Sequence, residues 1–470
     1  MQTAIADSST VSITSTSAGE EPPKRTAPVT KADIRRLKEC VVSRKPGLDG
    51  VLRQNGIQSV YDYVRGYVAK QVPVVCKTRQ QQLVSAVAAE TERLLGPAMA
   101  RSVEAQLTKY YSASTMDHSG PLYHPWALNF DLVSSIVALE HPDPLLQNVI
   151  TLAFSNVSLN NFAFPRGIAF HALNAKGELK QHRLSFFPSK LSTYPVFNLP
   201  AYTFADVARM KDVIHASVRS GEIDAAGGAA AEKMLDDIYA TSDVLACATY
   251  TDQIAKVNAA LWKRVNARHS SRKDVNLVYL EQESIVAKIL VDHHLHAGTL
   301  IAKLILDQSA VTTAMTYFDR LPEAFSVWEK RGTYLFWGLP KGAKRRVQLW
   351  KRGNELVSDD GSFKVALTPE AIAAGLQSRE LIPGTMISLL TLSFYHGLTS
   401  FGGLGQVCYL PLMHAAYLKL TRDVQDRESE RVAAGLNAQL FGGEMMIAFL
   451  EGAKNDAVLA TAGDLVLYGD

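Results

Sequence analysis

The run NVITLAFSNV, residues 148–157, contains β-branched and other apolar residues and predicts a β-strand. Two more strand-like runs follow it, GIAFHAL at residues 167–173 and ELKQHRLSFF at residues 178–187. The NAKG segment at residues 174–177 is typical of a hairpin turn between them. Since this region shows no clean alternation of strand, helix and strand, we expect a mixed, largely antiparallel sheet covered by helices. The predicted fold class is α/β or α+β.

Outward from this strand-rich region, the sequence predicts four segments. The Ser- and Thr-rich stretch 1–29 has too few apolar residues to offset its ordering entropy, and we interpret it as a disordered tail. Residues 30–111 read as a helical N-terminal region, and residues 112–330 as a core of mixed sheet and helix. Residues 331–470 form a C-terminal α/β region, which we expect to pack on that core.

Helix starts can be placed from local sequence. Proline is favoured in the first turn of a helix, so we expect helices to begin at Pro125, Pro369 and Pro411. Thr203 and Asp206 form a pattern like a capping box and predict another helix start. These positions divide the chain into elements of ordinary length.

Composition excludes several classes of protein. The net charge of +3 on 470 residues gives no support to bulk attraction for nucleic acid or for membranes. The apolar run at residues 382–398 is short for a bilayer span and contains Pro383, Gly384 and His396, which favours a buried helix. The four cysteines lie far apart, which is typical of a reducing compartment and disfavours a cysteine zinc site. We therefore expect a cytoplasmic protein, with a homo-oligomer left open.

The stretch TMDHSGPLYHPWALN, residues 115–129, is the first candidate site. Histidine can act as acid, base or metal ligand near neutral pH, and His118 and His124 lie on either side of a Gly-Pro turn. Asp117 could orient an imidazole ring. We predict that Asp117, His118 and His124 are catalytic. The competing interpretation is a turn whose histidines only cap the following helix.

The asparagines at the end of the predicted strand are the second candidate. Asn156 and Asn160 are poor strand residues in a strand-rich region, and such a conflict is expected at a functional site. Arg166 could present its planar guanidinium to a carboxylate or phosphate. We predict that Asn156, Asn160, Arg166 and His171 bind substrate, with an asparagine-stabilised loop as the alternative.

The motif VDHHLHAG, residues 291–298, holds three histidines and an acid. On a helix, His293 and His296 share a face, so they are candidate ligands of a divalent transition metal such as iron or zinc. The signal is weak, because the helical zinc motif requires histidines four residues apart and an adjacent glutamate. A polar helix end is the other interpretation, and the sequence identifies no cofactor.

Two further segments suggest anion binding. The turn SFGGLGQV, residues 400–407, precedes a helix, and we predict that Gly403 and Gly405 bind substrate there. It lacks the Lys-Ser/Thr pair of a P-loop, and a tight turn packed against the core is the alternative. The basic segment LPKGAKRRVQLWKRG, residues 339–353, predicts a hairpin in which Arg345 contacts substrate. A solvated hairpin and nucleic-acid binding are the alternatives to that role.

Together these features predict an intracellular enzyme of small-molecule metabolism. It would use histidine acid–base chemistry on a polar substrate that carries a carboxylate or phosphate. One alternative is an iron- or zinc-dependent enzyme with a histidine site. Another is a non-catalytic protein that binds an anionic partner, although nucleic acid is disfavoured.

Overall fold

The structure of the protein is a computed structural model. It describes residues 30–71, 73–122, 125–161, 164, 166–267, 274–442, 445–451 and 457–468. The chain divides into two units, residues 1–46 and 47–470. The first unit contains helix α1 (Lys31–Arg44), which begins with a capping box between Thr30 and Asp33. All residues of the candidate site belong to the second unit.

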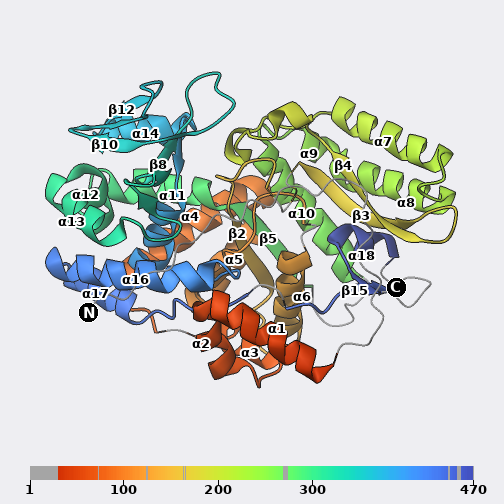
Figure 1. Ribbon diagram of the computed structural model, residues 1–470, viewed down its shortest axis with the longest axis horizontal. Coiled ribbons are helices and arrows are strands. Elements are labelled where there is room, and N and C mark those ends of the chain that lie inside the picture. Colours follow the sequence, from red (N-terminus) through yellow and green to blue (C-terminus); the bar gives the residue numbers. More distant parts are fainter. Residues whose placement is uncertain are drawn as a thin grey trace. The chain divides into compact units, whose positions relative to one another are not determined.

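A parallel sheet forms the centre of the second unit (Figure 1). Its four strands lie in the order β14-β1-β2-β5, and each pairing is parallel. The strands are β1 (Ser112–Ser114), β2 (Asn148–Ala153), β5 (Asn276–Glu281) and β14 (Thr399–Phe401). The mixed helix and strand content agrees with the predicted fold class. The expectation of a largely antiparallel sheet is not confirmed, because antiparallel pairing occurs only in the smaller sheets of the described chain.

Strand β2 is the first part of the run NVITLAFSNV, and its side chains explain the parallel arrangement. All six of its residues are buried. Ile150 and Leu152 pack into one hydrophobic cluster, whereas Val149 and Ala153 pack into another on the opposite face. Helices therefore cover both faces of the sheet, and a strand buried on both faces has a continuous apolar sequence instead of an alternating one.

The helices that cover the sheet come from distant parts of the sequence. Helices α4 and α5 pack together and contact β2 or β5, while α6 contacts β2 and α10 contacts β5. Helix α6 begins at Pro125, as predicted. The helices of this part are α2 (Pro46–Asn55), α3 (Val60–Val68), α4 (Lys77–Leu95), α5 (Pro97–Lys109), α6 (Pro125–Glu140), α10 (Tyr250–Ala267) and α11 (Gln282–Ile289).

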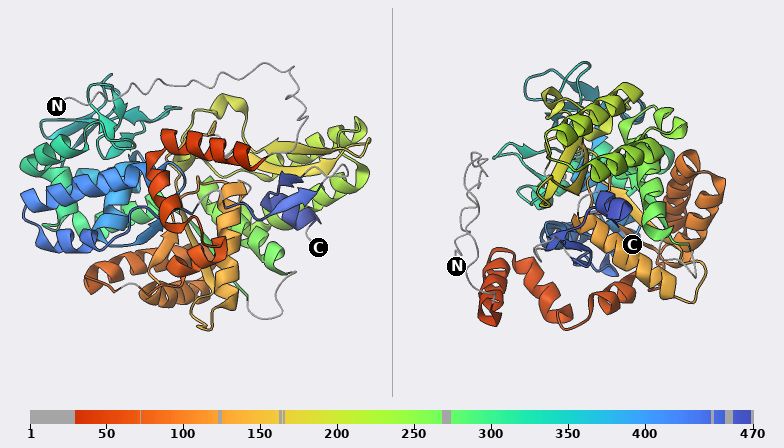
Figure 2. Two further views of the ribbon diagram at one scale, coloured as in Figure 1. Left: turned by 60° about the horizontal axis from the view of Figure 1, so that its bottom comes forward. Right: turned by 90° about the vertical axis from the view of Figure 1, so that its right-hand side faces the viewer.

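A hairpin with its own helices extends from the sheet between β2 and β5 in sequence. Strands β3 (Gly167–Leu173) and β4 (Leu179–Ser185) pair around residues 174–177, which confirms the predicted hairpin. Helices α7 and α8 pack against it (Figure 2), and α7 begins with the predicted capping box of Thr203 and Asp206. The remaining elements here are η1 (Ser189–Leu191), η2 (Val196–Asn198), α7 (Phe204–Arg219), α8 (Ala225–Met234), η3 (Leu235–Tyr239) and α9 (Ser242–Leu245).

The chain between β5 and β14 forms small antiparallel sheets and several helices. Strand β9 lies in the basic segment 339–353 and pairs with β8, which directly precedes that segment, so the basic segment forms a hairpin as predicted. The strands are β6 (Phe325–Ser326), β7 (Arg331–Gly332), β8 (Phe336–Gly338), β9 (Val347–Gln348), β10 (Trp350–Arg352), β11 (Glu355–Val357), β12 (Lys364–Ala366) and β13 (Leu381–Pro383). The helices are η4 (Leu290–His294), α12 (Leu300–Leu306), α13 (Gln308–Phe318), α14 (Pro369–Gln377), α15 (Thr385–Leu389) and η5 (Leu390–Tyr395).

After β14 the chain continues into α16 (Gln406–Asp423) and α17 (Arg427–Ala434), followed by β15 (Phe449–Glu451), β16 (Ala457–Leu459) and α18 (Ala462–Tyr468). Helix α14 begins at Pro369 as predicted, but α16 begins five residues before Pro411, which lies inside the helix. The apolar run at residues 382–398 is buried, and it is helical from Thr385. Within the described ranges, every helix is too short or too polar to span a bilayer.

Candidate functional site

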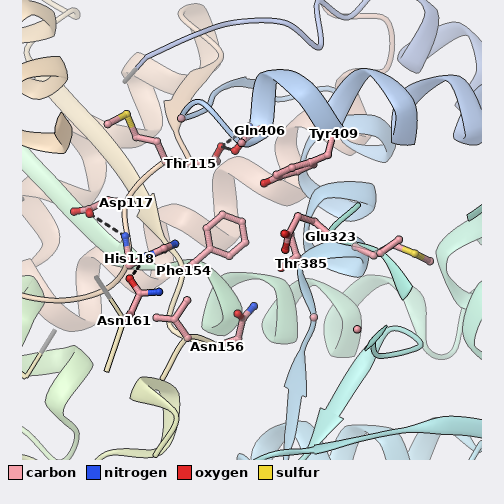
Figure 3. A pocket seen from close by; sticks show the side chains of 18 of the residues that line it. Thr115, Asp117, His118, Phe154, Asn156, Asn161, Glu323, Thr385, Gln406 and Tyr409 are labelled. Atoms are coloured by element: carbon pink, nitrogen blue, oxygen red, sulfur yellow. Dashed lines mark hydrogen bonds between the residues drawn. The ribbon is translucent and has the colours of Figure 1, made fainter. Parts of the chain in front are cut away.

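A cavity of about 620 Å³ opens where strands of the central sheet end. Residues that directly follow β1, β2 and β14 line it, including Gly403 and the two residues His118 and Asn156 that Figure 3 labels. Because the three strands are parallel, their carboxyl ends lie at the same edge of the sheet. In open parallel sheets, ligands bind at this edge. The cavity therefore occupies the position where the fold favours a functional site.

His118 lies on the segment that follows β1. A β-bridge to Phe154, at the end of β2, fixes its backbone, and its Nδ1 lies 2.7 Å from Oδ1 of Asn161. With Nδ1–H as the donor to this amide oxygen, the ring lone pair is on Nε2. Burial lowers the pKa of His118 below its usual 6.5, while the Asn161 contact partly opposes that change. The imidazole is therefore neutral at pH 7 and can accept a proton.

Asp117 holds the backbone of this segment. Its Oδ1 accepts a hydrogen bond from the backbone N–H of His118, and its Oδ2 accepts one from the Tyr279 hydroxyl on β5, both at 2.8 Å. Burial raises the pKa of Asp117 to about 7, although the two hydrogen bonds lower it. Figure 3 shows the carboxylate on the side of the His118 backbone, away from Tyr409. Its contacts fix the loop without touching the His118 ring.

Glu283, near the start of α11, fixes the segment after β2 in a similar way. Its carboxylate accepts hydrogen bonds from the backbone N–H and the hydroxyl of Ser155, both at 2.8 Å, and from the backbone N–H of Asn156 at 3.1 Å. Burial, followed by the charge of Glu281, raises the pKa of Glu283 to about 7. These three hydrogen bonds set the position of Asn156 at the wall of the cavity.

Arg346 supplies a positive charge to the cavity wall. Its guanidinium lies over the Trp337 ring, 4.0 Å from the ring centroid, and Nη1 donates to Oδ1 of Asn156 at 3.3 Å. Burial lowers the pKa of Arg346 to about 10, and the charges of Glu283 and Glu323 oppose that change. The side chain stays protonated at pH 7, and a stacked, fixed guanidinium is suited to bind a carboxylate or phosphate.

The glycine-rich turn connects β14 with α16 beside the cavity. Gly403 and Gly405 both line the cavity, and α16 begins at Gln406 without a side-chain cap. Gln406 reaches across to β1, where its Nε2 donates to the Thr115 hydroxyl at 2.9 Å (Figure 3). The N-terminal end of a helix carries partial positive charge, so this wall also favours an anion.

The structure brings together some of the predicted residues at the cavity. Its lining includes these five: Asp117, His118, Asn156, Gly403 and Gly405. The lining among the described residues does not include the following six: Asn160, Arg166, His171, Arg345, His293 and His296. His124 lies outside the described residues, so its position relative to His118 stays a prediction.

The predicted residues outside the cavity have other contacts. His171, on β3, is buried, and its Nδ1 lies 2.8 Å from the Asp464 carboxylate on α18. Arg166 donates to the Phe187 backbone carbonyl at 3.4 Å, and Arg345 donates to the Thr193 hydroxyl at 3.3 Å. These side chains connect segments of the protein to one another.

The predicted metal ligands lie at the end of the η4 helix. His293 is half-buried, and His296 is exposed in the turn that follows. Across the part of the chain that the structure describes, no three His, Cys, Asp or Glu side chains are grouped as metal ligands. The proposed role of His293 and His296 in metal binding therefore gains no support from geometry.

The predicted site did not include several residues that line the cavity, among them Asn161, Glu323, Arg346 and Tyr409. Asn161 and Arg346 are direct neighbours of the predicted Asn160 and Arg345, so the segments were identified but not the residues that face the cavity. The short strands around them give no periodic signal that could decide which side chain points inward. Glu323 and Tyr409 had no sequence signal, because each lies in a segment without a motif.

Comparison with known proteins gives no independent indication of function. The chain matches no protein-family model and no curated protein.

Proposed function

We propose that the protein is an enzyme of small-molecule metabolism that binds a polar, anionic substrate in this cavity. His118 would act as the acid–base group, and Arg346 would bind the carboxylate or phosphate of the substrate. The observation that carries the proposal is that a neutral imidazole and a fixed guanidinium line one cavity at the carboxyl edge of a parallel sheet. Since all four cysteines are free thiols, we also propose a cytoplasmic location.

Such a reaction needs one group that orients the substrate and one that accepts and returns a proton. Arg346 and the start of α16 would orient the anionic group, and His118, with its Nδ1–H donating to Asn161, would accept the proton at Nε2. A positioned acid–base group contributes roughly 10²- to 10⁴-fold to a reaction rate. The proton returns from His118 to the product, so the residue is unchanged after one cycle.

The proposal is tested by incubating the purified protein with a mixture of cellular metabolites and following their amounts by mass spectrometry. We expect the wild type to change at least one carboxylate- or phosphate-bearing metabolite. His118→Ala should slow that change by roughly 10²-fold or more. His215→Ala is the matched control, because His215 is exposed on α7 and lies outside the cavity.

Arg346→Lys separates binding from chemistry. Lysine keeps the charge but loses the planar fork and the stacking on Trp337, so KM should rise more than kcat falls. Equal turnover by the wild type and His118→Ala would contradict the catalytic role. Binding of a metabolite without turnover would support the non-catalytic alternative instead.

A further inference from the structure

Glu323 places a negative charge in the same cavity as Arg346. Its side chain lines the cavity, and Figure 3 shows the carboxylate directed toward the space between Phe154 and Tyr409. Among the described residues, Glu323 forms no ion pair. An acidic group beside aromatic rings is the arrangement that proteins use to bind an ammonium group, through ionic attraction and cation–π contact.

The backbone at Glu323 is held in an unfavourable conformation. Glu323 has a φ of +59°, a region that non-glycine residues rarely adopt, and it lies in a segment where Arg320, Lys330 and Leu335 also have positive φ. The segment is fixed by a hydrogen bond of 2.7 Å from Arg320 N–H to the Phe325 carbonyl, and by one of 3.0 Å from Val327 N–H to Asp319. Backbone strain of this kind concentrates at ligand-binding segments.

The two opposite charges do not neutralise each other by direct contact. Arg346 is held by Trp337 and Asn156, and no ion pair forms between Arg346 and Glu323. Both side chains face one cavity of about 620 Å³, which is large enough for a ligand the size of an amino acid. Glu323 is an exposed residue that also lines the cavity, so an ammonium group on the ligand would gain a favourable charge contact there that a purely anionic ligand would not.

We infer that the ligand of this cavity is a zwitterion of the amino-acid class, with its anionic group on Arg346 and its ammonium group on Glu323 beside Tyr409 and Phe154. This inference rests on the proposed function, since it takes the anion-binding role of Arg346 as its starting point. It adds the requirement for an amine and thereby identifies Glu323 as a specificity-determining residue.

Two matched sets of probes test the requirement for an amine. The first set is L-phenylalanine, 3-phenylpropionate and 2-phenylethylamine, which share one ring and differ only in their charged groups. The second is 5-aminopentanoate, pentanoate and pentylamine, in which the charges are farther apart. Binding of each probe to the full chain is measured by isothermal titration calorimetry. We expect one zwitterion to bind severalfold more tightly than both singly charged relatives.

Variants of Glu323 and Arg346 then show which of the two residues recognises which charged group of the ligand. Glu323→Gln should remove the preference of the protein for the zwitterion over the carboxylate and leave carboxylate binding unchanged or stronger. Arg346→Gln should remove the preference for the zwitterion over the amine. Glu370→Gln, at an exposed position outside the cavity, carries the same charge change and should leave all affinities unchanged.

The possible outcomes distinguish this inference from the proposed function. If carboxylates bind as tightly as zwitterions and require Arg346, the inference is overturned but the anion site stands. If Glu323→Gln retains the full preference for the zwitterion, the inference is also overturned. If no probe binds at millimolar concentration, the inference is overturned, and so is the binding of small carboxylates by Arg346.

Discussion

The Asn161 side chain controls both the tautomer and the orientation of His118. Its Oδ1 is 2.7 Å from Nδ1 of the ring, and this contact raises the pKa of His118 against the larger effect of burial. We therefore predict that Asn161→Ala lowers the pKa of His118 further, measured by NMR titration of the imidazole. Asn160→Ala is the control, since Asn160 is a neighbour outside the cavity lining. A His118 pKa that is unchanged in Asn161→Ala would contradict this role.

A comparison of the predicted residues with the residues that line the cavity shows how closely the sequence could locate the site. The segment TMDHSGPLYHPWALN contributes Asp117 and His118 to the cavity lining, and their catalytic role stays a prediction. Asn160 and Arg345 were each one residue away from the side chain that faces the cavity. That difference depends on the local backbone of short, irregular segments, and sequence patterns do not determine it.

At the scale of elements, the turn between β14 and α16 contains two adjacent glycines that differ in how closely other side chains pack against them. A Cβ on Gly402 would overlap the Gln406 side chain, which holds Thr115, whereas a Cβ on Gly403 would meet only Met116 Cβ at 3.9 Å. We predict that Gly402→Ala lowers the free energy of unfolding by about 1–3 kcal/mol, as overpacking does. Gly403→Ala should leave it nearly unchanged. Urea unfolding of both variants makes the comparison, and equal losses would contradict it.

Two π-helical elements, η4 and η5, place a pair of buried histidines together. The rings of His294 and His396 lie 5.4 Å apart, and the Nε2 atom of each has no hydrogen-bond partner among the described residues. The Nδ1–H of His396 donates to the Thr391 carbonyl at 2.7 Å, which fixes the neutral tautomer. Burial lowers the pKa of His396 to about 4 and also lowers that of His294.

This pair predicts acid sensitivity. Below pH 6.5 these histidines bind protons in the unfolded chain but stay neutral where they are buried in the folded protein. The free energy of unfolding is therefore unaffected above pH 6.5 and decreases as the pH falls toward 4. For His396 alone the loss is on the order of 3 kcal/mol. The difference in unfolding free energy between the wild type and His396→Phe, measured by urea unfolding across this range, should shrink as the pH falls. A difference independent of pH would contradict the prediction.

The elements also show why the antiparallel arrangement that we expected is not confirmed for the central sheet. The run NVITLAFSNV was identified as a strand, but its continuous apolar character, which indicates burial on both faces, was not used. Strands β1 and β14 have three residues each, too few to show a pattern. The hairpin at residues 174–177 was predicted correctly, because its turn residues and its strands are adjacent in sequence.

At the scale of the whole molecule, the cavity depends on contacts between distant parts of the chain. Strand β1 pairs with β14, which follows it by nearly three hundred residues, and that pairing brings the glycine turn next to His118. The segment with Glu323 and the hairpin with Arg346 complete the walls. Local sequence contains no information on such pairings, so the convergence of these groups could not be predicted.

The central claim is that His118 and the carboxyl edge of the parallel sheet form the ligand site. Its most direct test uses protein labelled with carbon-13 at Cε1 of its 12 histidines, observed by NMR while the tightest-binding probe is added. His118→Ala assigns the resonance of His118 by its disappearance. We expect this resonance to shift in proportion to occupancy, while those of His171, His293 and His296 stay in place. A static His118 resonance together with a shift at one of those three would contradict it.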